Sequence, residues 1–334
     1  MDFHLEFTPK PLISKICHHQ QLMLIGSCFT ENIGEKLMAH KFSVMQNPNG
    51  ILFNPVSVAE AIDNYISNKK ISGEELFFLN EGFHSWQHHS RFSSPVKETA
   101  VQKINASTEA AHHYLKAADV LLITLGSAWV YILTDEASNA NPGTVAANNH
   151  KAPSAWFHRR LLSSEELDEI LSGMLSRLQA FNPGLKIIFT ISPVRHLREG
   201  FVENNRSKAT LINAVHKLAD SSEQVSYFPA YELVIDDLRD YRFYAEDMVH
   251  PNYAATNYVW EKFVNACIDE PSQQLMKIIN EINAAKSHKP FNSMSEAHCS
   301  FLQKNLEKVN TLKEKYPYIN FDPETAYFSN TLQR

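Results

Sequence analysis

Five short apolar segments, separated by stretches with helical spacing, constrain the fold of this chain more than any other feature. They comprise residues 21–26, 42–46, 119–126, 185–192 and 224–230. Each is apolar or rich in β-branched side chains, and most end in Gly, Pro, Ser or Asn, as buried strands do. Near-continuous apolar runs of this kind are typical of a parallel sheet that is covered on both faces.

Between these segments, apolar side chains recur with the spacing of amphipathic helices. The clearest case is residues 164–181, where Leu167, Leu171 and Leu178 share a face. Ser164 is expected to cap this helix, and the Asn-Pro-Gly after residue 181 is expected to end it. Further helices are expected at residues 29–37, 56–68, 207–220 and 251–268. The alternation of strands and helices predicts an α/β sandwich joined by right-handed crossovers.

Two regions interrupt the alternation, and we interpret both as insertions in one α/β domain that spans residues 1–268. Residues 55–118 begin with an expected helix and then pass through a polar, aromatic segment, whereas residues 134–158 are rich in turn-forming residues. Residues 269–334 carry two charged amphipathic segments. We expect them to form a helical extension that packs on the same body or against a second subunit, so a homo-oligomer is one open possibility.

Composition argues against several classes of protein. The net charge of -6 disfavours a general nucleic-acid binder, because neutralising phosphates needs a surplus of Lys and Arg. No window reaches the roughly 18 uninterrupted apolar residues that a membrane span requires. The first 15 residues lack the apolar core of a secretory signal, so we expect a cytoplasmic location.

Neither a metal nor an organic cofactor is expected from the sequence. The four cysteines are far apart and lack Cys-x-x-Cys spacing, which indicates reduced thiols rather than disulfides or a zinc site. No glycine-rich loop of the kind that cradles phosphates occurs. His88 and His89 are adjacent in an expected insertion and point in different directions, so a shared metal is not expected, although His88 can overhang a site as part of a lid.

A serine and a cysteine stand at the seam between the first expected strand and its helix. Ser27 follows Gly26 directly, so it is expected at the carboxyl edge of the sheet, where open α/β sheets place their ligands. The amides at the start of the helix would help to stabilise an oxyanion there. Ser27 is therefore either a nucleophile or an ordinary helix cap. Cys28 is a second candidate nucleophile, although it is one residue into the helix and should point elsewhere.

A matching base occurs near the end of the α/β region. Asp247 and His250 stand in Asp-x-x-His spacing, and Pro251 favours an extended conformation at the histidine. This separation lets the carboxylate hold one imidazole nitrogen while the other accepts a proton, which is what a serine nucleophile needs. The alternative is a purely structural role, a surface turn in which Asp247 accepts a hydrogen bond from the backbone.

Taken together, these motifs resemble the GSCFA branch of the SGNH/GDSL hydrolase superfamily. The motif that names the branch stands at residues 26–30, and similar segments follow in order at residues 47–55, 123–131, 190–196 and 238–251. The resemblance covers about residues 20–268. It implies a flavodoxin-like three-layer α/β/α sandwich with a mainly parallel five-stranded sheet, and a triad of Ser27 as nucleophile, His250 as base and Asp247 as orienter.

The resemblance also implies an oxyanion hole, with one departure. Backbone amides at Ser27 and Gly50 are the expected donors, and the superfamily's third block adds an Asn side chain after the third strand. Here that block reads Gly126-Ser127-Ala128-Trp129, so the Asn is absent. Asn54, Ser127 and Trp129 are the side chains available to replace it. Gly126 is also a candidate oxyanion residue. One such donor is worth on the order of 3 kcal/mol of barrier.

Several other residues are candidates for substrate binding. Arg195 and His196 follow the fourth strand, so both are expected at the same edge as Ser27, with Trp129 and His88 nearby. The Arg195 guanidinium either clamps a carboxylate or phosphate of the substrate or pairs with a loop acid.

We therefore expect an esterase that cleaves a small-molecule ester or an acylated carbohydrate. An O-acyltransferase with a carbohydrate-like acceptor is the nearest variant. Two further hypotheses are a weakened SGNH scaffold that binds a small ligand, which the missing Asn motivates, and a thiol-dependent enzyme that uses Cys28.

Overall fold

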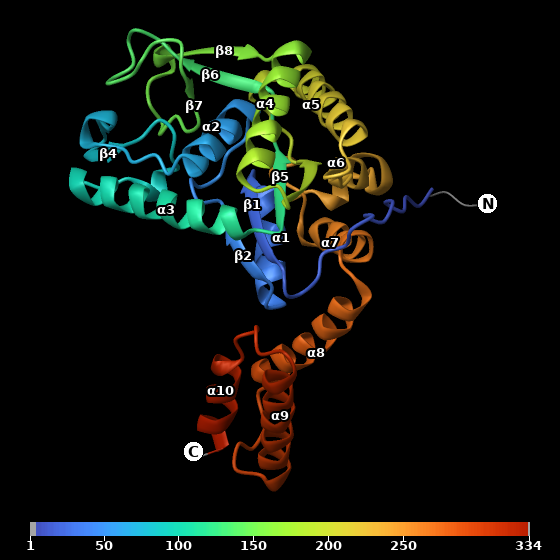
Figure 1. Ribbon diagram of the computed structural model, residues 1–334. Coiled ribbons are helices and arrows are strands. Elements are labelled where there is room, and N and C mark those ends of the chain that lie inside the picture. The colour runs from blue at the N-terminus through green and yellow to red at the C-terminus, as the bar shows by residue number, and fades with distance from the viewer. Residues whose placement is uncertain (1–4, 333–334) are drawn as a thin grey trace.

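The computed structural model describes residues 5–332, and its centre is a five-stranded parallel sheet (Figure 1). Residues 1–4 and 333–334 lie outside this range. The first group belongs to the 15 residues considered for a secretory signal, and the second to the expected helical extension. The strand order is β10-β9-β5-β1-β2, which is the flavodoxin-like order. The strands are β1 (Gln21–Gly26), β2 (Ser43–Gln46), β5 (Val120–Leu125), β9 (Lys186–Ile191) and β10 (Val225–Tyr227). All five predicted strands are thereby confirmed.

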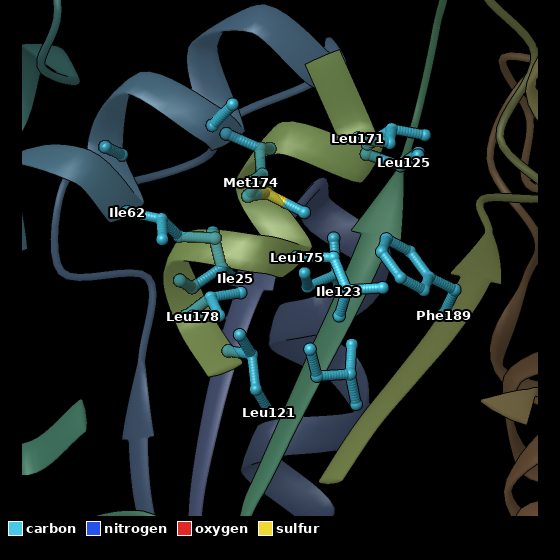
Figure 2. Close-up of a cluster of buried hydrophobic side chains, with 14 of the residues drawn as sticks. Ile25, Ile62, Leu121, Ile123, Leu125, Leu171, Met174, Leu175, Leu178 and Phe189 are labelled. Carbon is cyan, nitrogen blue, oxygen red and sulfur yellow. The ribbon is translucent and has the colours of Figure 1, made fainter. Parts of the chain in front are cut away.

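Helices cover both faces of this sheet, as the three-layer prediction requires. One face packs against α2 (Pro55–Ile66), α3 (Lys97–Ala117), α4 (Ser164–Phe181) and α5 (Phe201–Ser221). The other packs against α1 (Cys28–Ala39) and α7 (Tyr253–Cys267). Figure 2 shows Ile25 of the sheet near Leu178 of α4, and Ile123 near Leu175, within one buried cluster. Alternate residues of each strand point to opposite faces and pack in the two cores, so the sheet is apolar on both faces.

The start of α4 differs from the prediction by one residue. Ser163, not Ser164, is the N-cap: its hydroxyl accepts a hydrogen bond from Glu166 N, and Glu166 reaches back to the amide of Ser163. Ser164 is the first helical residue. The reciprocal pair requires Ser and Glu three positions apart, and only Ser163 has Glu at that spacing.

The two expected insertions contain more regular structure than their sequences indicate. Residues 55–118 contribute α2 and α3 to the main core, and between these helices lies a hairpin of β3 (Phe77–Leu79) and β4 (Gly82–His84). A small antiparallel sheet joins β6 (Trp129–Leu133), β7 (Val145–Ala146) and β8 (Phe157–Leu161). Figure 1 shows it at the end of the molecule opposite the C-terminal helices.

The remaining helices are mostly short. A π-helix, η5 (Leu233–Leu238), follows α6 (Ala230–Glu232). Single 3₁₀ turns are η1 (Gly73–Glu75), η2 (Ser90–Phe92), η3 (Ser154–Trp156), η4 (Leu197–Glu199) and η6 (Tyr241–Phe243). Of the helices in residues 5–332, none has the length and apolar character needed to cross a membrane.

The C-terminal helices form a core of their own. They are α8 (Glu270–Ser287), α9 (Glu296–Lys315) and α10 (Asp322–Leu332), and the last was not foreseen from the sequence. Glu324 of α10 is buried between Lys41, 2.7 Å away beyond the end of α1, and Lys286, 3.0 Å away. Since Lys41 belongs to the sandwich, this carboxylate ties the helical unit to it.

We predict that Glu324→Ala loosens this connection. The substitution leaves two partly buried ammonium groups without their carboxylate, at a cost of about 2–3 kcal/mol, below that of a fully buried pair. Hydrogen exchange in α10 should speed up while exchange in β5 stays slow. The exposed Glu314→Ala in α9 is the matched control, and equal exchange in both variants would show that the connection does not depend on this charge.

Candidate active site

Ser27 lies where β1 ends, next to the end of β5. Gly26 pairs in register with Thr124, and the amide of Ser27 donates to the carbonyl of Thr124 at 3.2 Å. A Cβ at Gly26 would lie 2.2 Å from the Thr124 oxygen, and Gly26 has a φ of +146°, so only glycine fits here. The close approach of the two strands therefore fixes the position of Ser27.

The hydroxyl of Ser27 is buried and caps α1. It accepts a hydrogen bond from the amide of Phe29 at 3.3 Å, and the residue has no exposed surface. The helix-cap interpretation is thus correct for this state of the chain. Capping uses only the acceptor side of the hydroxyl, so its proton remains available for transfer to a base.

Asp247 and His250 form the contact that their spacing suggests. The Asp247 Oδ2 lies 2.6 Å from His250 Nδ1, and Oδ1 accepts the amides of His250 at 3.0 Å and Val249 at 2.9 Å. The hydrogen bonds from the amide and the ring of His250 hold the pKa of Asp247 at about 2. The carboxylate therefore stays ionised and fixes the ring with Nδ1 towards it, which leaves Nε2 as the proton acceptor.

Arg195 joins the loop after β9 to the loop that carries His250. Its amide donates to the carbonyl of Val249 at 3.2 Å, and its Nη1 donates to the carbonyl of Met248 at 3.3 Å. The guanidinium also lies over the Tyr244 ring, 4.0 Å from its centroid. Among the described residues Arg195 pairs with these carbonyls rather than with an acid, and the anion clamp stays a prediction. The contacts make Arg195 a support for the loop that carries His250.

His196 lies over the end of β5. Its ring meets Phe53 edge-on at 5.3 Å, and its Nε2 would be 3.1 Å from a Cβ placed on Gly126. Burial, followed by the charges of Lys208 and His250, lowers its pKa to about 3. The ring is therefore neutral, and it stands between the loop after β5 and the loop of the expected base.

Lys208 is a buried residue of this edge that the sequence analysis did not single out. Its Nζ donates to the carbonyls of Gly126 and Ser192, both at 2.6 Å, and so fastens the ends of β5 and β9 together. Burial lowers its pKa to about 7, whereas the two acceptors favour the ammonium form. The signal was present in the helix pattern, because Lys208 falls on the same stripe as Leu211 and Val215.

The expected oxyanion amides are engaged within the chain. Gly50, in a turn with a φ of +83°, donates its amide to Asn47 O at 2.7 Å, and Gly126 donates to Phe53 O at 2.8 Å. The amide of Ser27 is held by Thr124, as described above. The Asn54 side chain caps α2, with Oδ1 2.9 Å from Ser57 N and Nδ2 3.0 Å from Ser57 Oγ. One amide hydrogen of Asn54 is then still available.

A cavity of about 360 Å³ opens beside these residues. Its wall includes five predicted site residues, which are Asn54, Ser127, Trp129, Arg195 and His196, together with Tyr131, Asn148 and Asn149. Ser27, Asp247 and His250 are not part of that wall. Among the hydrogen bonds of residues 5–332, none joins Ser27 Oγ to His250. The structure therefore joins Asp247 to His250, and shows no hydrogen bond from Ser27 to that pair among the described residues.

His88 and Cys28 do not take the roles considered for them. His88 is buried, its Nδ1 is 2.8 Å from Ser85 Oγ, and it lines a different cavity of about 440 Å³. Burial, followed by the charge of Glu31, raises the pKa of the Cys28 thiol. That direction opposes a thiolate nucleophile, so the burial of this thiol outweighs the effect of the helix N-terminus.

Two family models match this sequence. Residues 21–263 match the model described as GSCFA family, and residues 279–334 match that described as GSCFA domain protein, C-terminal domain. The chain therefore belongs to the GSCFA family. No curated protein matches its sequence.

Two solved structures are distantly similar. One is a carbohydrate esterase family 3 from Talaromyces cellulolyticus, with 10% identity, a TM-score of 0.35, and coverage of 78% of this chain and 99% of that chain. The other is an acetyl esterase mutant with an acetate ion, with 9% identity, a TM-score of 0.35, and coverage of 79% and 99%. Neither likeness bears on the chemistry of the site.

We predict that Lys208→Met destabilises the folded chain. The two carbonyls that lose their donor are buried, and each unpaired group costs about 1–3 kcal/mol. Lys217→Met on the same helix removes only an exposed contact with Asp168 and should change stability by less than about 1 kcal/mol. Denaturant unfolding of both variants measures the difference, and equal midpoints would contradict the role of Lys208.

Lys208 should also give stability a recognisable pH dependence. Its pKa in the folded chain is about 7, below the ordinary value of 10.5. Between these values the unfolded chain binds more protons, so this group's contribution to stability rises with pH and is lost as pH falls towards 7. Unfolding at about pH 7 and pH 9 should therefore show a larger gain for the wild type than for Lys208→Met.

Proposed function

We propose that this chain is an SGNH-type serine hydrolase that cleaves an acyl ester. Ser27 is the nucleophile, His250 the general base and Asp247 the group that orients His250. The observation that carries the proposal is the 2.6 Å contact between Asp247 Oδ2 and His250 Nδ1, on a loop that Arg195 fastens to the edge where Ser27 lies.

The reaction follows from these positions. Ser27 Oγ attacks the acyl carbon while His250 Nε2 accepts its proton, and the tetrahedral intermediate expels the alcohol, which takes the proton from His250. Water then attacks the acyl-enzyme with His250 again as base, which releases the acid and restores Ser27. Asp247 stays ionised throughout, which its depressed pKa supports.

A rearrangement must precede attack, because Ser27 is buried. The side chains of His250 and Asp247 are 51% and 50% exposed, so the pair has room to move together with its contact intact. Contacts of this kind are often long in free enzymes and tighten when substrate binds. Entry of the acyl group beside Asn54 and His196 would open the path from the cavity to the serine.

The cavity favours a carbohydrate-like alcohol. Trp129 and Tyr131 offer aromatic faces, and Asn148 and Asn149 offer amide groups that donate and accept hydrogen bonds. This mixture suits a polyhydroxylated ring with apolar faces.

A second candidate function is acyl transfer to such an alcohol. The complete burial of Ser27 supports it, because a site that excludes water protects the acyl-enzyme from hydrolysis. The chemistry is the same up to the acyl-enzyme, so one experiment tests the shared step.

We expect a fluorophosphonate probe to label Ser27, with the site mapped by mass spectrometry. Labelling should vanish in Ser27→Ala and fall strongly in His250→Ala. Asp247→Asn should lower kcat/KM for a nitrophenyl acetate by a factor on the order of 10³–10⁴, because the imidazole loses its tautomer and orientation.

Cys28→Ala is the matched control, since it alters the neighbouring thiol and should keep most of the activity. Loss of labelling in Cys28→Ala with labelling retained in Ser27→Ala would favour the thiol enzyme instead. A folded wild type that neither labels nor hydrolyses esters would favour a ligand-binding scaffold.

A further inference from the structure

The backbone amides at this edge offer the proposed reaction no free donor for the developing negative charge. The amides of Ser27, Gly50 and Gly126 all donate to carbonyls of the chain. The third sequence block offers Ser127, whose Oγ contacts Ser207 Oγ at 3.3 Å and accepts the amide of Trp129 at 3.1 Å. An acyl-transfer site without such donors would lose a factor of about 10²–10³ in kcat for each one missing.

Three side chains near this edge, Thr124, Thr190 and His196, each have a buried polar atom without a partner among the described residues, and of these only His196 lines the cavity. His196 Nε2 is buried and makes no hydrogen bond within residues 5–332. A buried, unpaired polar atom is costly, so its retention calls for an explanation. The backbone amide of His196 donates to Asn204 Oδ1 at 2.9 Å, which fixes the backbone of His196. The ring nitrogen Nε2 then lies over Gly126.

We propose that His196 donates its Nε2–H to the oxygen of the substrate carbonyl, in the place of the missing Asn side chain. This inference rests on the proposed function. It makes His196 a catalytic residue that touches the reacting oxygen, with the remaining amide hydrogen of Asn54 as a second donor.

The surrounding contacts bring His196 to the right edge from two sides. On one side, the ring lies against Gly126, and Gly126 follows the strand whose Thr124 holds the amide of Ser27. On the other side, the neighbouring Arg195 bonds to Val249, next to His250. His196 therefore lies between the loop that follows β5 and the loop that carries His250. It also lines the cavity.

The chemistry of the ring suits a donor better than a base. Burial and the nearby charges of Lys208 and His250 keep it neutral, with a pKa of about 3. A neutral imidazole with its proton on Nε2 donates a hydrogen bond without giving up the proton, as polarising neutral histidines do. His250, by contrast, is held through Nδ1 by the Asp247 carboxylate, which leaves its Nε2 for the role of base. In this proposal His196 is the hydrogen-bond donor and His250 is the base.

The experiment compares His196→Ala with His196→Asn in the full chain, with a nitrophenyl acetate as the ester. We expect His196→Ala to lower kcat by about 10²–10³-fold with little change in KM, because the donor acts mainly on the transition state. His196→Asn should recover at least tenfold of that loss, since its amide restores an N–H donor. His88→Ala is the matched control, a buried histidine in the other cavity, and should keep the wild-type kcat.

A spectroscopic readout separates a donor from a merely structural residue. In wild type labelled at Ser27 with the fluorophosphonate, the Nε2 proton of His196 should shift downfield in NMR, since the phosphonyl oxygen mimics the oxyanion. A resonance that stays unchanged in the adduct would overturn the inference.

The outcomes also distinguish the two proposals. Wild-type activity that Ser27→Ala abolishes, with unchanged kcat in a folded His196→Ala, rejects the His196 inference alone. An equal loss in His196→Ala and His196→Asn also rejects it. A folded wild type with neither labelling nor hydrolysis rejects the proposed function and the inference with it.

Discussion

The pairing of β5 with β1 on one side and β9 on the other is the constraint on which the site depends. All six residues of β5 are buried, and both neighbours are parallel to it. Parallel strands end at the same edge, so Gly26, Gly126 and Ser192 come together there without any direct attraction between the loops that follow. Gly26 permits the closest approach, since any side chain would collide with Thr124.

The edge is held by polar groups that lie in the interior. Lys208 binds two carbonyls, Ser27 caps a helix beneath the surface, and His196 presents an unpaired nitrogen. Burying polar groups is unfavourable unless each finds a partner. Lys208 and Ser27 do so within the chain. His196 does not, and this difference is why the further proposal is centred on it.

Sequence reasoning recovered the parts that local patterns determine. Five apolar runs gave the strands, and three-residue spacing was enough to expect the contact of Asp247 with His250. The small β6–β7–β8 sheet was hidden because its strands are short and lie among turn residues. The hydrogen-bond partners of Gly50 and Gly126 were not foreseeable, since they depend on turn geometry and on Phe53. Lys208 and His196 acquire their roles only when distant segments pack, although a lysine within the apolar stripe of α5 was a visible clue.

The walls of the cavity come from two different parts of the fold. Trp129 and Tyr131 belong to the small antiparallel sheet, and Asn148 and Asn149 follow β7. The other side of the wall is formed by Asn54 and His196 of the central sandwich, which also carries Ser27 and His250 outside the wall. Under the proposed function, the small antiparallel sheet would contribute to recognition of the alcohol, whereas bond breaking would depend on the central sandwich. Substitutions in residues 129–149 would then change which molecule is accepted while the reacting groups keep their scaffold. Such a chain would diversify its choice of substrate while its chemistry stays the same.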